Sequence, residues 1–296
     1  MDIGFIGLGS MGLPMATHLL AGGDHKLRVY NRTASKADPL VKKGAELMSN
    51  SASVATSGGV VITMLADDAA VESVVLGADS IAQRLAPGGI HISMSTIAPA
   101  TARKLAEYHA ESGSIYVAAP VFGRPEAAAA KRLWICTSGP HDAKHKVASI
   151  LHAMGQKLFD FGEDAGAAHT VKVAGNFLIA AAMESIAEAL AMIEKSGVDR
   201  VAAIEMLSST LFACPVYQGY GAAIAHMRHT PVGFRLPLGL KDVDLALETG
   251  TELRVPMPIA SMLHDRFLES IAKGRTELDW SGIALAAREN AGLPPK

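Results

Sequence analysis

Cysteine is scarce in this sequence: only Cys136 and Cys214 occur among 296 residues, far apart and without metal-ligand spacing. This usage argues against a disulfide scaffold and is typical of a reducing compartment, so we expect a cytoplasmic protein. The net charge is only −2, which gives no electrostatic case for binding nucleic acid or an anionic membrane. The longest apolar run, residues 171–193, carries Glu184 and Glu188, and therefore predicts a buried helix rather than a membrane span.

Glycine, by contrast, is concentrated where the sequence opens. An apolar stretch, residues 3–6, leads into Gly7-Leu8-Gly9-Ser10-Met11-Gly12, and a helical pattern follows at once. A strand, a Gly-x-Gly-x-x-Gly turn and a helix in that order are typical of a dinucleotide-binding unit. Gly7 permits the tight turn, Gly9 lets the backbone approach a pyrophosphate, and Gly12 lets the helix pack on the strand. The alternative is a glycine-rich turn that binds no ligand.

A second short strand, residues 26–30, ends in Asn31, Arg32 and Thr33. Folds that select NAD usually place Asp or Glu here, where the carboxylate binds the ribose 2′-hydroxyl. This sequence offers an amide, a guanidinium and a hydroxyl instead, and Arg32 can pair with a 2′-phosphate. The segment therefore favours NADP, with NAD as the second choice. In the alternative interpretation Thr33 only caps the next helix and Arg32 is solvated.

Apolar strands then alternate with helical segments. Strands are expected at residues 60–65, 90–94, 115–119, 133–137 and 157–161. The alternation predicts an α/β fold with an N-terminal Rossmann domain, a doubly wound parallel sheet that binds ligands at its carboxyl edge. After residue 162 only helices are expected, the first of them long and a later one over residues 215–228. We predict an NADP-binding Rossmann domain at 1–163 and an all-α substrate and oligomerisation domain at 164–296, built on a long interdomain helix.

That long helix carries Lys172 and Asn176, which lie four residues apart and so share one face. Their neighbours are nearly all apolar, and a lysine on an apolar face is rarely fully buried without a purpose. Desolvation lowers the pKa of such a lysine and favours proton exchange near neutral pH. Lys172 can then donate a proton to a carbonyl oxygen as hydride arrives, while Asn176 holds the substrate. The alternative is a lysine that snorkels at a domain junction.

Histidines provide weaker signals. His141 and His145 have a spacing that could bind a metal on a helix, but only Asp142 stands near as a third ligand, so we predict no metal site. His169, one helical turn before Lys172, is interpreted as a packing residue rather than a residue of the cleft.

Several motifs occur in order along the chain, and together they make it similar to the β-hydroxyacid dehydrogenase family. That family includes 3-hydroxyisobutyrate dehydrogenases and glyoxylate/succinic semialdehyde reductases and is a relative of 6-phosphogluconate dehydrogenase. The motifs are residues 7–16, 31–33, 95–99, 119–121, 166–176 and 241–246.

The resemblance implies roles for individual residues. Lys172 matches the catalytic lysine and Asn176 its partner on the substrate, whereas Asp242 is expected to fix a neighbouring lysine or the local helix end. The resemblance also implies a homodimer or homotetramer assembled through the helical domain. The remaining cofactor contacts that it implies are Leu65, Ala66, Thr96 and Lys241.

One motif departs from the family pattern. The substrate loop usually reads Ala-Pro-Val-Ser-Gly-Gly, but this chain has Phe122, Gly123 and Arg124 after Ala-Pro-Val. In one hypothesis Arg124 replaces the usual grip on a substrate carboxylate. In the other, Phe122 makes the pocket apolar, and the substrate lacks a carboxylate at that place. Ser95 is expected either to touch substrate or cofactor or to cap its turn.

The sequence therefore predicts an oxidoreductase that transfers a hydride between NADP(H) and a small β-hydroxy acid or semialdehyde. Lys172 would be the acid/base, and the cofactor would carry the difficult chemistry. The first alternative is an imine reductase, or a reductase of uncharged carbonyls, on the same scaffold. The second is a nucleotide-binding module without turnover, against which the intact lysine argues.

Overall fold

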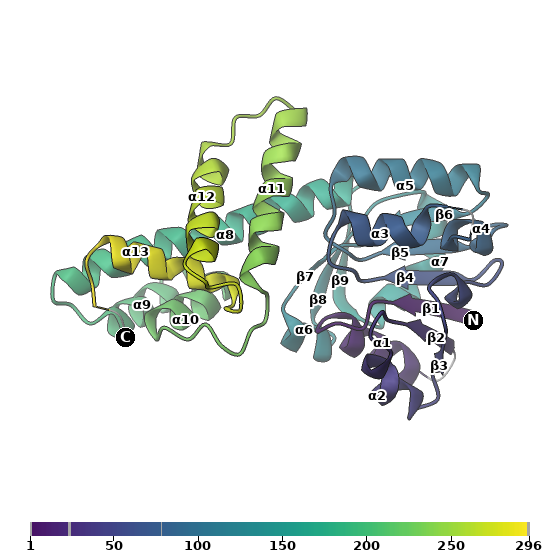
Figure 1. Ribbon diagram of the computed structural model, residues 1–296, viewed down its shortest axis with the longest axis horizontal. Coiled ribbons are helices and arrows are strands. Elements are labelled where there is room, and N and C mark those ends of the chain that lie inside the picture. Colours follow the sequence, from purple (N-terminus) through teal and green to yellow (C-terminus); the bar gives the residue numbers. More distant parts are fainter. Residues whose placement is uncertain (1, 23–24, 78, 295–296) are drawn as a thin grey trace. The chain divides into compact units, whose positions relative to one another are not determined.

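The computed structural model describes residues 2–22, 25–77 and 79–294 (Figure 1). It divides into two compact units, Met1–Lys172 and Val173–Lys296. The strand patterns that suggested a boundary at 163/164 end just before helix α8 (Ala167–Lys195), and the two units meet within this helix.

The first unit is built on a six-stranded parallel sheet with the strand order β3-β2-β1-β4-β5-β6. The order reverses between β1 and β4, which creates the crevice at the carboxyl ends of the strands where such sheets bind ligands. The predicted α/β fold with a doubly wound parallel sheet is therefore confirmed. The strands are β1 (Asp2–Ile6), β2 (Lys26–Tyr30), β3 (Glu46–Leu47), β4 (Val60–Thr63), β5 (Ile90–Ser93) and β6 (Ile115–Ala118).

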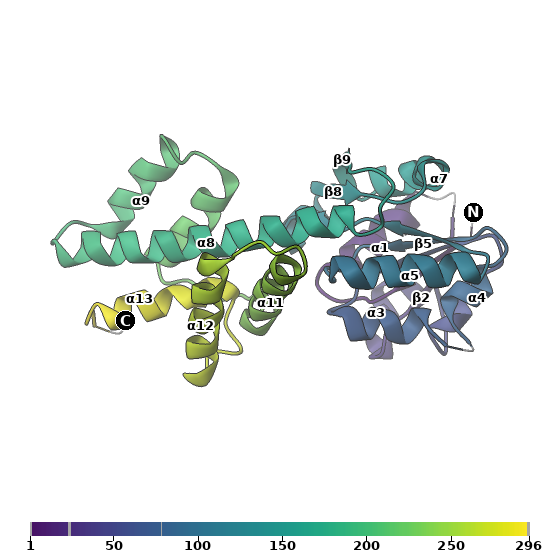
Figure 2. The same ribbon diagram turned by 90° about the horizontal axis from the view of Figure 1, so that it is seen from above.

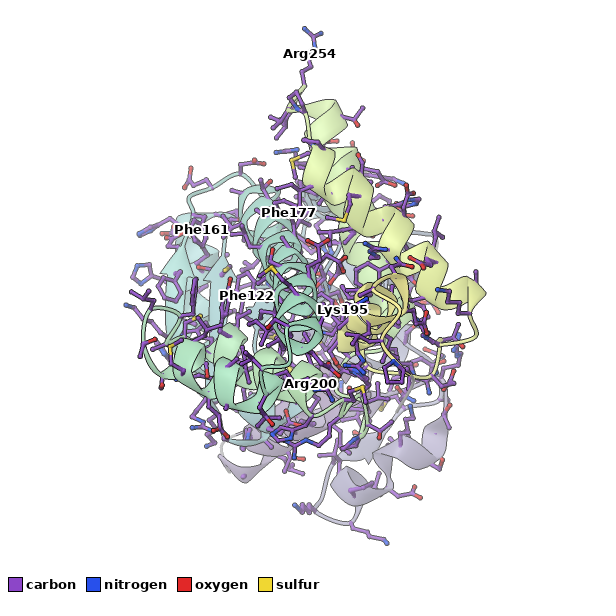
Figure 3. The ribbon with its side chains drawn as sticks, turned by 90° about the vertical axis from the view of Figure 1, so that its left-hand side faces the viewer. Phe122, Phe161, Phe177, Lys195, Arg200 and Arg254 are labelled. Carbon is purple, nitrogen blue, oxygen red and sulfur yellow. The ribbon has the colours of Figure 1, made fainter. Side chains whose placement is uncertain are left out.

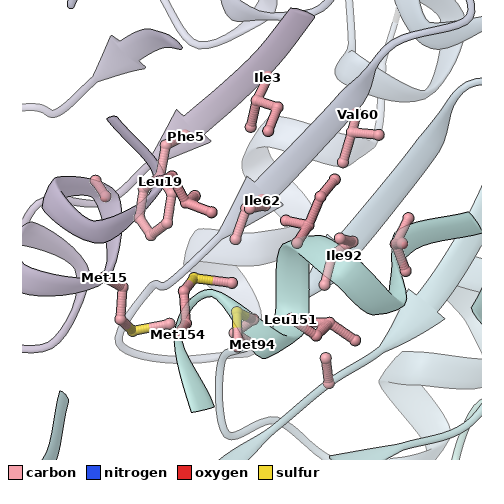
Figure 4. Close-up of a cluster of buried hydrophobic side chains, with 14 of the residues drawn as sticks. Ile3, Phe5, Met15, Leu19, Val60, Ile62, Ile92, Met94, Leu151 and Met154 are labelled. Carbon is pink, nitrogen blue, oxygen red and sulfur yellow. The ribbon is translucent and has the colours of Figure 1, made fainter. Parts of the chain in front are cut away.

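Each face of this sheet has its own buried core. Because side chains alternate along a strand, Ile3 and Phe5 point to one face, where they pack with Met15 and Leu151, as Figure 4 shows. Ile6 belongs to the core on the opposite face. The helices and 3-10 turns of this unit are α1 (Gly12–Ala21), η1 (Ala34–Ala37), α2 (Asp38–Val41), η2 (Ala52–Val54), α3 (Asp68–Val75), α4 (Ile81–Leu85), α5 (Pro99–Glu111), α6 (Pro125–Ala129) and α7 (His141–His152).

The last strands of the unit form a separate sheet of three, in the order β7-β8-β9. It comprises β7 (Val121–Phe122), β8 (Leu133–Thr137) and β9 (Gly155–Asp160), and β7 runs antiparallel to β8. The sequence did not predict β7, because two residues after Pro120 carry no periodic signal. The backbone N–H of Cys136 donates to the carbonyl oxygen of Pro120 at 2.9 Å, which turns the chain away from the large sheet.

The second unit is helical, and no named strand follows β9 in the described residues. Its elements after α8 are α9 (Arg200–Ser209), η3 (Tyr217–Gly221), α10 (Ala222–Ala225), α11 (Leu236–Glu252), α12 (Pro258–Ala272), η4 (Trp280–Ile283) and α13 (Ala284–Asn290). The helix expected over residues 215–228 covers residues 215–225, with the π-helical segment η3 in its middle. A Cβ at Gly221 would lie 2.8 Å from the side chain of Ile204, which would have to shift to admit it.

Helix α8 is the core element of the second unit. By length and composition it could cross a membrane, but Met183 and Ile186 pack into the core with Phe267 and Trp280. Figure 2 shows α9 and α12 on opposite sides of α8. Between α11 and α12 the chain turns at Arg254, whose side chain points away from the unit (Figure 3).

Candidate active site

The glycine turn after β1 has the geometry of a phosphate-binding loop. Gly7 has φ +98°, a conformation that favours glycine. A Cβ at Gly12 would lie 1.9 Å from the carbonyl oxygen of Gly7, so the start of α1 packs directly on the turn. These contacts assign Gly7 and Gly12 to shaping the loop.

Gly9 differs from these two glycines because a Cβ there would meet no described protein atom within 4 Å. The open side of the loop therefore faces space that the protein does not fill. Met11, the N-cap of α1, makes no side-chain capping bond in the described structure. The first amides of a helix have no partners within it and favour anions. The loop thus fits the pyrophosphate of a dinucleotide.

Asn31 joins the loop to the end of β2. Its Oδ1 accepts a hydrogen bond from the backbone N–H of Leu8 at 2.9 Å, and its Nδ2 donates to the carbonyl oxygen of Thr33 at 2.9 Å. Arg32 and Thr33 are exposed beside it. Thr33 is the N-cap of η1, but its side chain makes no capping hydrogen bond. The side chains of both Arg32 and Thr33 therefore stand exposed at the end of β2.

The neighbouring strand ends are tied to one another. The hydroxyl of Ser95, which follows β5 and is buried, accepts from the backbone N–H of Leu65 at 2.8 Å. This bond gives Ser95 a structural contact. Leu65, Ala66 and Thr96 are at least partly exposed after β4 and β5. They therefore border the same carboxyl edge of the sheet as the glycine loop.

Lys172 lies against an aromatic ring. Its Nζ is 4.2 Å from the centroid of Phe122, and the lysine is only 7% exposed. Burial raises the pKa of the Cys136 thiol on β8 to about 11, while the charge of Lys172 acts in the opposite direction. The sequence predicted only an apolar role for Phe122, because β7 has no pattern that reveals this ring contact.

A second pair near Lys172 was also missed. The hydroxyl of Tyr116 on β6 lies 3.2 Å from Nε2 of His169, one helical turn before Lys172, and both side chains are buried. Burial raises the pKa of Tyr116 above its ordinary value, so the phenol stays protonated. A lone tyrosine in an otherwise aliphatic buried strand was the available signal, since a buried phenol normally finds a partner.

In the second unit Asn176 is held by an acidic residue of α11. Asn176 is buried, and its Nδ2 donates to Oδ2 of Asp242. Oδ1 of the same carboxylate lies 2.9 Å from Nζ of Lys241. The expectation that Asp242 fixes Lys241 matches this ion pair. The link from Asp242 to Asn176 was not foreseen.

Arg124 and Gly123 follow β7. Gly123 is exposed with φ +139°, and Arg124 is the N-cap residue of α6. The guanidinium Nε of Arg124 lies 3.8 Å from the carboxylate of Glu126, a loose and partly exposed ion pair. A partly exposed pair of this kind contributes little to stability.

The parts of this site define a class of protein: a nicotinamide-dinucleotide oxidoreductase. Residues 2–162 match the family model described as the NAD binding domain of 6-phosphogluconate dehydrogenase. Residues 166–286 match that described as NAD-binding of NADP-dependent 3-hydroxyisobutyrate dehydrogenase. The chain belongs to the β-hydroxyacid dehydrogenase family. Its cofactor is accordingly a nicotinamide dinucleotide, NADP or NAD.

Individual relatives match over nearly their whole length. The chain is 42% identical to an uncharacterized oxidoreductase of Bacillus subtilis, over 96% of this chain and 98% of the relative. It is 30% identical to glyoxylate/succinic semialdehyde reductase 1 of Arabidopsis thaliana, over 97% and 99% of the two chains. A structure of Mycobacterium tuberculosis 3-hydroxyisobutyrate dehydrogenase with L-serine has a TM-score of 0.85 at 26% identity, covering 97% and 98%.

Proposed function

We propose that this protein transfers a hydride between NADP(H) and a small β-hydroxy acid or the corresponding semialdehyde, with Lys172 as the acid/base. The observation that carries the proposal is a buried lysine on α8, one helical turn from an asparagine that Asp242 holds in place. Two of the similar proteins are named for 3-hydroxyisobutyrate and for glyoxylate and succinic semialdehyde, which supports a small acidic substrate.

The protein's own part in the reaction is to hold the substrate and move one proton. When bound, the nicotinamide supplies or accepts the hydride. In reduction the Lys172 ammonium donates a proton to the carbonyl oxygen, and the carbonyl becomes an alcohol. In oxidation the Lys172 amine takes the hydroxyl proton. An amide has two N–H groups and an oxygen, so Asn176 can bind Asp242 and still orient the substrate.

We propose that the cofactor preferred is NADP. Arg32 and Thr33 are exposed beside the glycine loop, and the Thr33 hydroxyl does not cap η1. A guanidinium forms paired, charge-assisted hydrogen bonds with a phosphate, whereas it gains little from a ribose hydroxyl. Leu65, Ala66, Thr96 and Lys241 complete the proposed cofactor contacts.

For the substrate carboxylate we propose Arg124, with Gly123 beside it. Its place two residues after Phe122, whose ring contacts Lys172, supports this role, because a guanidinium binds a carboxylate through paired, charge-assisted hydrogen bonds. Kinetics of Arg124→Ala on a carboxylated and an uncharged aldehyde test the role. A larger loss on the acid is expected, and equal losses on both would remove Arg124 from the substrate site.

The decisive experiment measures NADPH and NADH consumption by the purified protein with succinic semialdehyde, glyoxylate and an uncharged aldehyde of similar length. We expect turnover of the acids with NADPH. Lys172→Ala should abolish turnover while NADPH binding is kept. If Lys172→Ala retains turnover, the acid/base assignment fails. If NADPH binds but none of the three aldehydes is turned over, the proposed activity fails, and an imine reductase or a binding module takes its place.

We further propose a cytoplasmic homo-oligomer that assembles through the helical unit. Large apolar side chains are exposed on that unit, among them Met192 at 70% and Leu211 at 90%. Patches of this kind mark association surfaces, and a second copy of the chain supplies a matching patch. Light scattering on the eluting protein tests the assembly, and a strictly monomeric mass would contradict it.

A further inference from the structure

Phe122 occupies a defined place next to Lys172. It is the second residue of β7 and pairs in register with Trp134 of β8, so the ring is carried on a sheet rather than on a loose loop. Lys172 Nζ stands 4.2 Å from the ring centroid. Both residues belong to the first compact unit, so their contact is local to it.

The ring changes the balance between the two protonation states of the lysine. Burial disfavours an ammonium, since the charge loses its water. The negative face of an aromatic ring attracts a cation, and the attraction grows when the site is shielded from solvent. Lys172 is only 7% exposed, so the ring compensates part of the desolvation cost of the charged form. An aliphatic side chain of the same size would bury the lysine without this compensation.

Two other ionisable groups of the first unit lie close to Lys172. Burial raises the pKa of Cys136 on β8 to about 11, so the thiol is neutral near pH 7. His169, one turn earlier on α8, is bonded to the Tyr116 phenol. One turn later, Nδ2 of Asn176 donates to Asp242, whose carboxylate is also paired with Lys241.

We propose that Phe122 is a positioning residue that keeps Lys172 protonated and directed, so that the protein is poised as a proton donor for carbonyl reduction at neutral pH. This rests on the proposed role of Lys172 as the acid/base. It explains why an aromatic residue that forms no hydrogen bond can stand directly before Gly123 and Arg124 in the substrate loop.

The test follows the protonation of Lys172 in the cofactor-free protein. An amine-acylating reagent labels the neutral amine only, and mass spectrometry of the peptide that contains Lys172 gives the labelling rate at each pH. The pH midpoint of that profile reports the lysine pKa, whereas a change in access alters the rate at every pH alike. Phe122→Leu should lower the midpoint by about one pH unit. Phe122→Tyr keeps the ring, so its labelling midpoint should equal that of the wild type.

Two further variants keep the test decisive. Phe122→Met fills similar volume without a ring and replaces the leucine variant if that one does not fold; it should shift the midpoint in the same direction. Phe159→Leu removes a different lysine–ring contact, that of Lys157 at 4.9 Å on β9, and should leave the Lys172 midpoint unchanged. An unchanged midpoint in both folded ring-free variants would overturn the proposal.

Turnover provides an independent readout. In the reductive direction the alkaline limb of the kcat profile should move to lower pH in Phe122→Leu by the same amount as the labelling midpoint, with KM for NADPH unchanged. If kcat falls at every pH but the alkaline limb does not move, Phe122 contributes only packing and does not affect the protonation of Lys172. Failure of the proposed function gives a different result. In that case Lys172→Ala keeps its turnover, while the Lys172 labelling midpoint still changes in the Phe122 variants.

Discussion

The backbone N–H of Leu8 and the side-chain Oδ1 of Asn31 form a hydrogen bond of 2.9 Å that joins the glycine loop to the end of the neighbouring strand. The same amide donates to the carbonyl oxygen of Thr33. One side chain thus fixes both segments that are proposed to hold the cofactor, the pyrophosphate loop and the ribose end. A substitution of Asn31 should therefore affect the binding of both the pyrophosphate and the ribose.

Replacement of Asn31 separates geometry from charge. Asn31→Ala removes both hydrogen bonds, so NADPH and NADH should lose affinity together, by about tenfold. Asn31→Asp still accepts from Leu8 but places a negative charge beside the 2′-phosphate, so NADPH should lose more affinity than NADH. Fluorescence titration with both cofactors measures the two losses. If Asn31→Asp lowers the affinities for NADPH and NADH equally, the 2′-phosphate does not bind near Asn31.

The glycines of the loop should differ sharply when each is changed to alanine. A Cβ at Gly12 would overlap the carbonyl oxygen of Gly7, so Gly12→Ala should destabilise the fold by about 2 kcal/mol or more. Gly9→Ala meets no described protein atom, so its stability should stay near wild type while NADPH affinity falls at least about tenfold. Urea unfolding and cofactor titration on both variants check this contrast. If Gly9→Ala binds NADPH as tightly as the wild type does, the pyrophosphate does not bind beside Gly9.

The architecture was predictable because its signals are local. The run from residue 3 through Gly12 combines a strand period, a turn that only glycine allows and a helix start, and the structure confirms this order. The apolar strands and the long helix were identified for the same reason. The helix expected over residues 215–228 spans residues 215–225, but its middle, Tyr217–Gly221, is π-helical, an irregularity that the helical period of the sequence does not encode.

Side-chain partners across elements were less predictable. Lys172 and Asn176 stood out because a helix period puts them on one face, but their contacts come from residues far away in sequence. Phe122 reaches Lys172 from β7, which pairs with β8, and Asp242 reaches Asn176 because α11 and residues 173–195 of α8 belong to the same unit. Such pairings depend on which elements pack together, and the spacing of residues along the sequence does not determine this.

Arg32 provides the test of cofactor choice. Arg32→Ala should lower the affinity for NADPH by about tenfold or more, the value of one charge-assisted phosphate contact, and leave NADH almost unchanged. The effect on NADPH should shrink at high salt, because the guanidinium is exposed. Lys36→Ala, on η1, is the matched control for loss of one positive charge nearby. If Arg32→Ala and Lys36→Ala behave alike, general electrostatic attraction accounts for the preference.

A buried histidine pair predicts the pH dependence of stability. His91 Nδ1 and His109 Nε2 lie 3.0 Å apart, with Thr63 and Ser114 at the two ends of the chain of hydrogen bonds. Burial lowers the pKa of His109 to about 4, and burial, followed by the charge of His109, lowers that of His91 well below its ordinary value. Both side chains are therefore neutral in the folded protein at pH 7.

Below about pH 6.5 the unfolded chain binds protons on these histidines and the folded protein does not, so stability falls as the pH falls. For His109 the loss reaches about 3 kcal/mol once the pH is below 4. Urea unfolding between pH 7.5 and 5 should give a shallower decline in His109→Gln than in wild type, because carboxylates contribute equally to both. His152→Gln, an exposed histidine at the end of α7, should keep the wild-type slope. If His109→Gln declines as steeply as wild type, the pKa of His109 is not lowered in the folded protein.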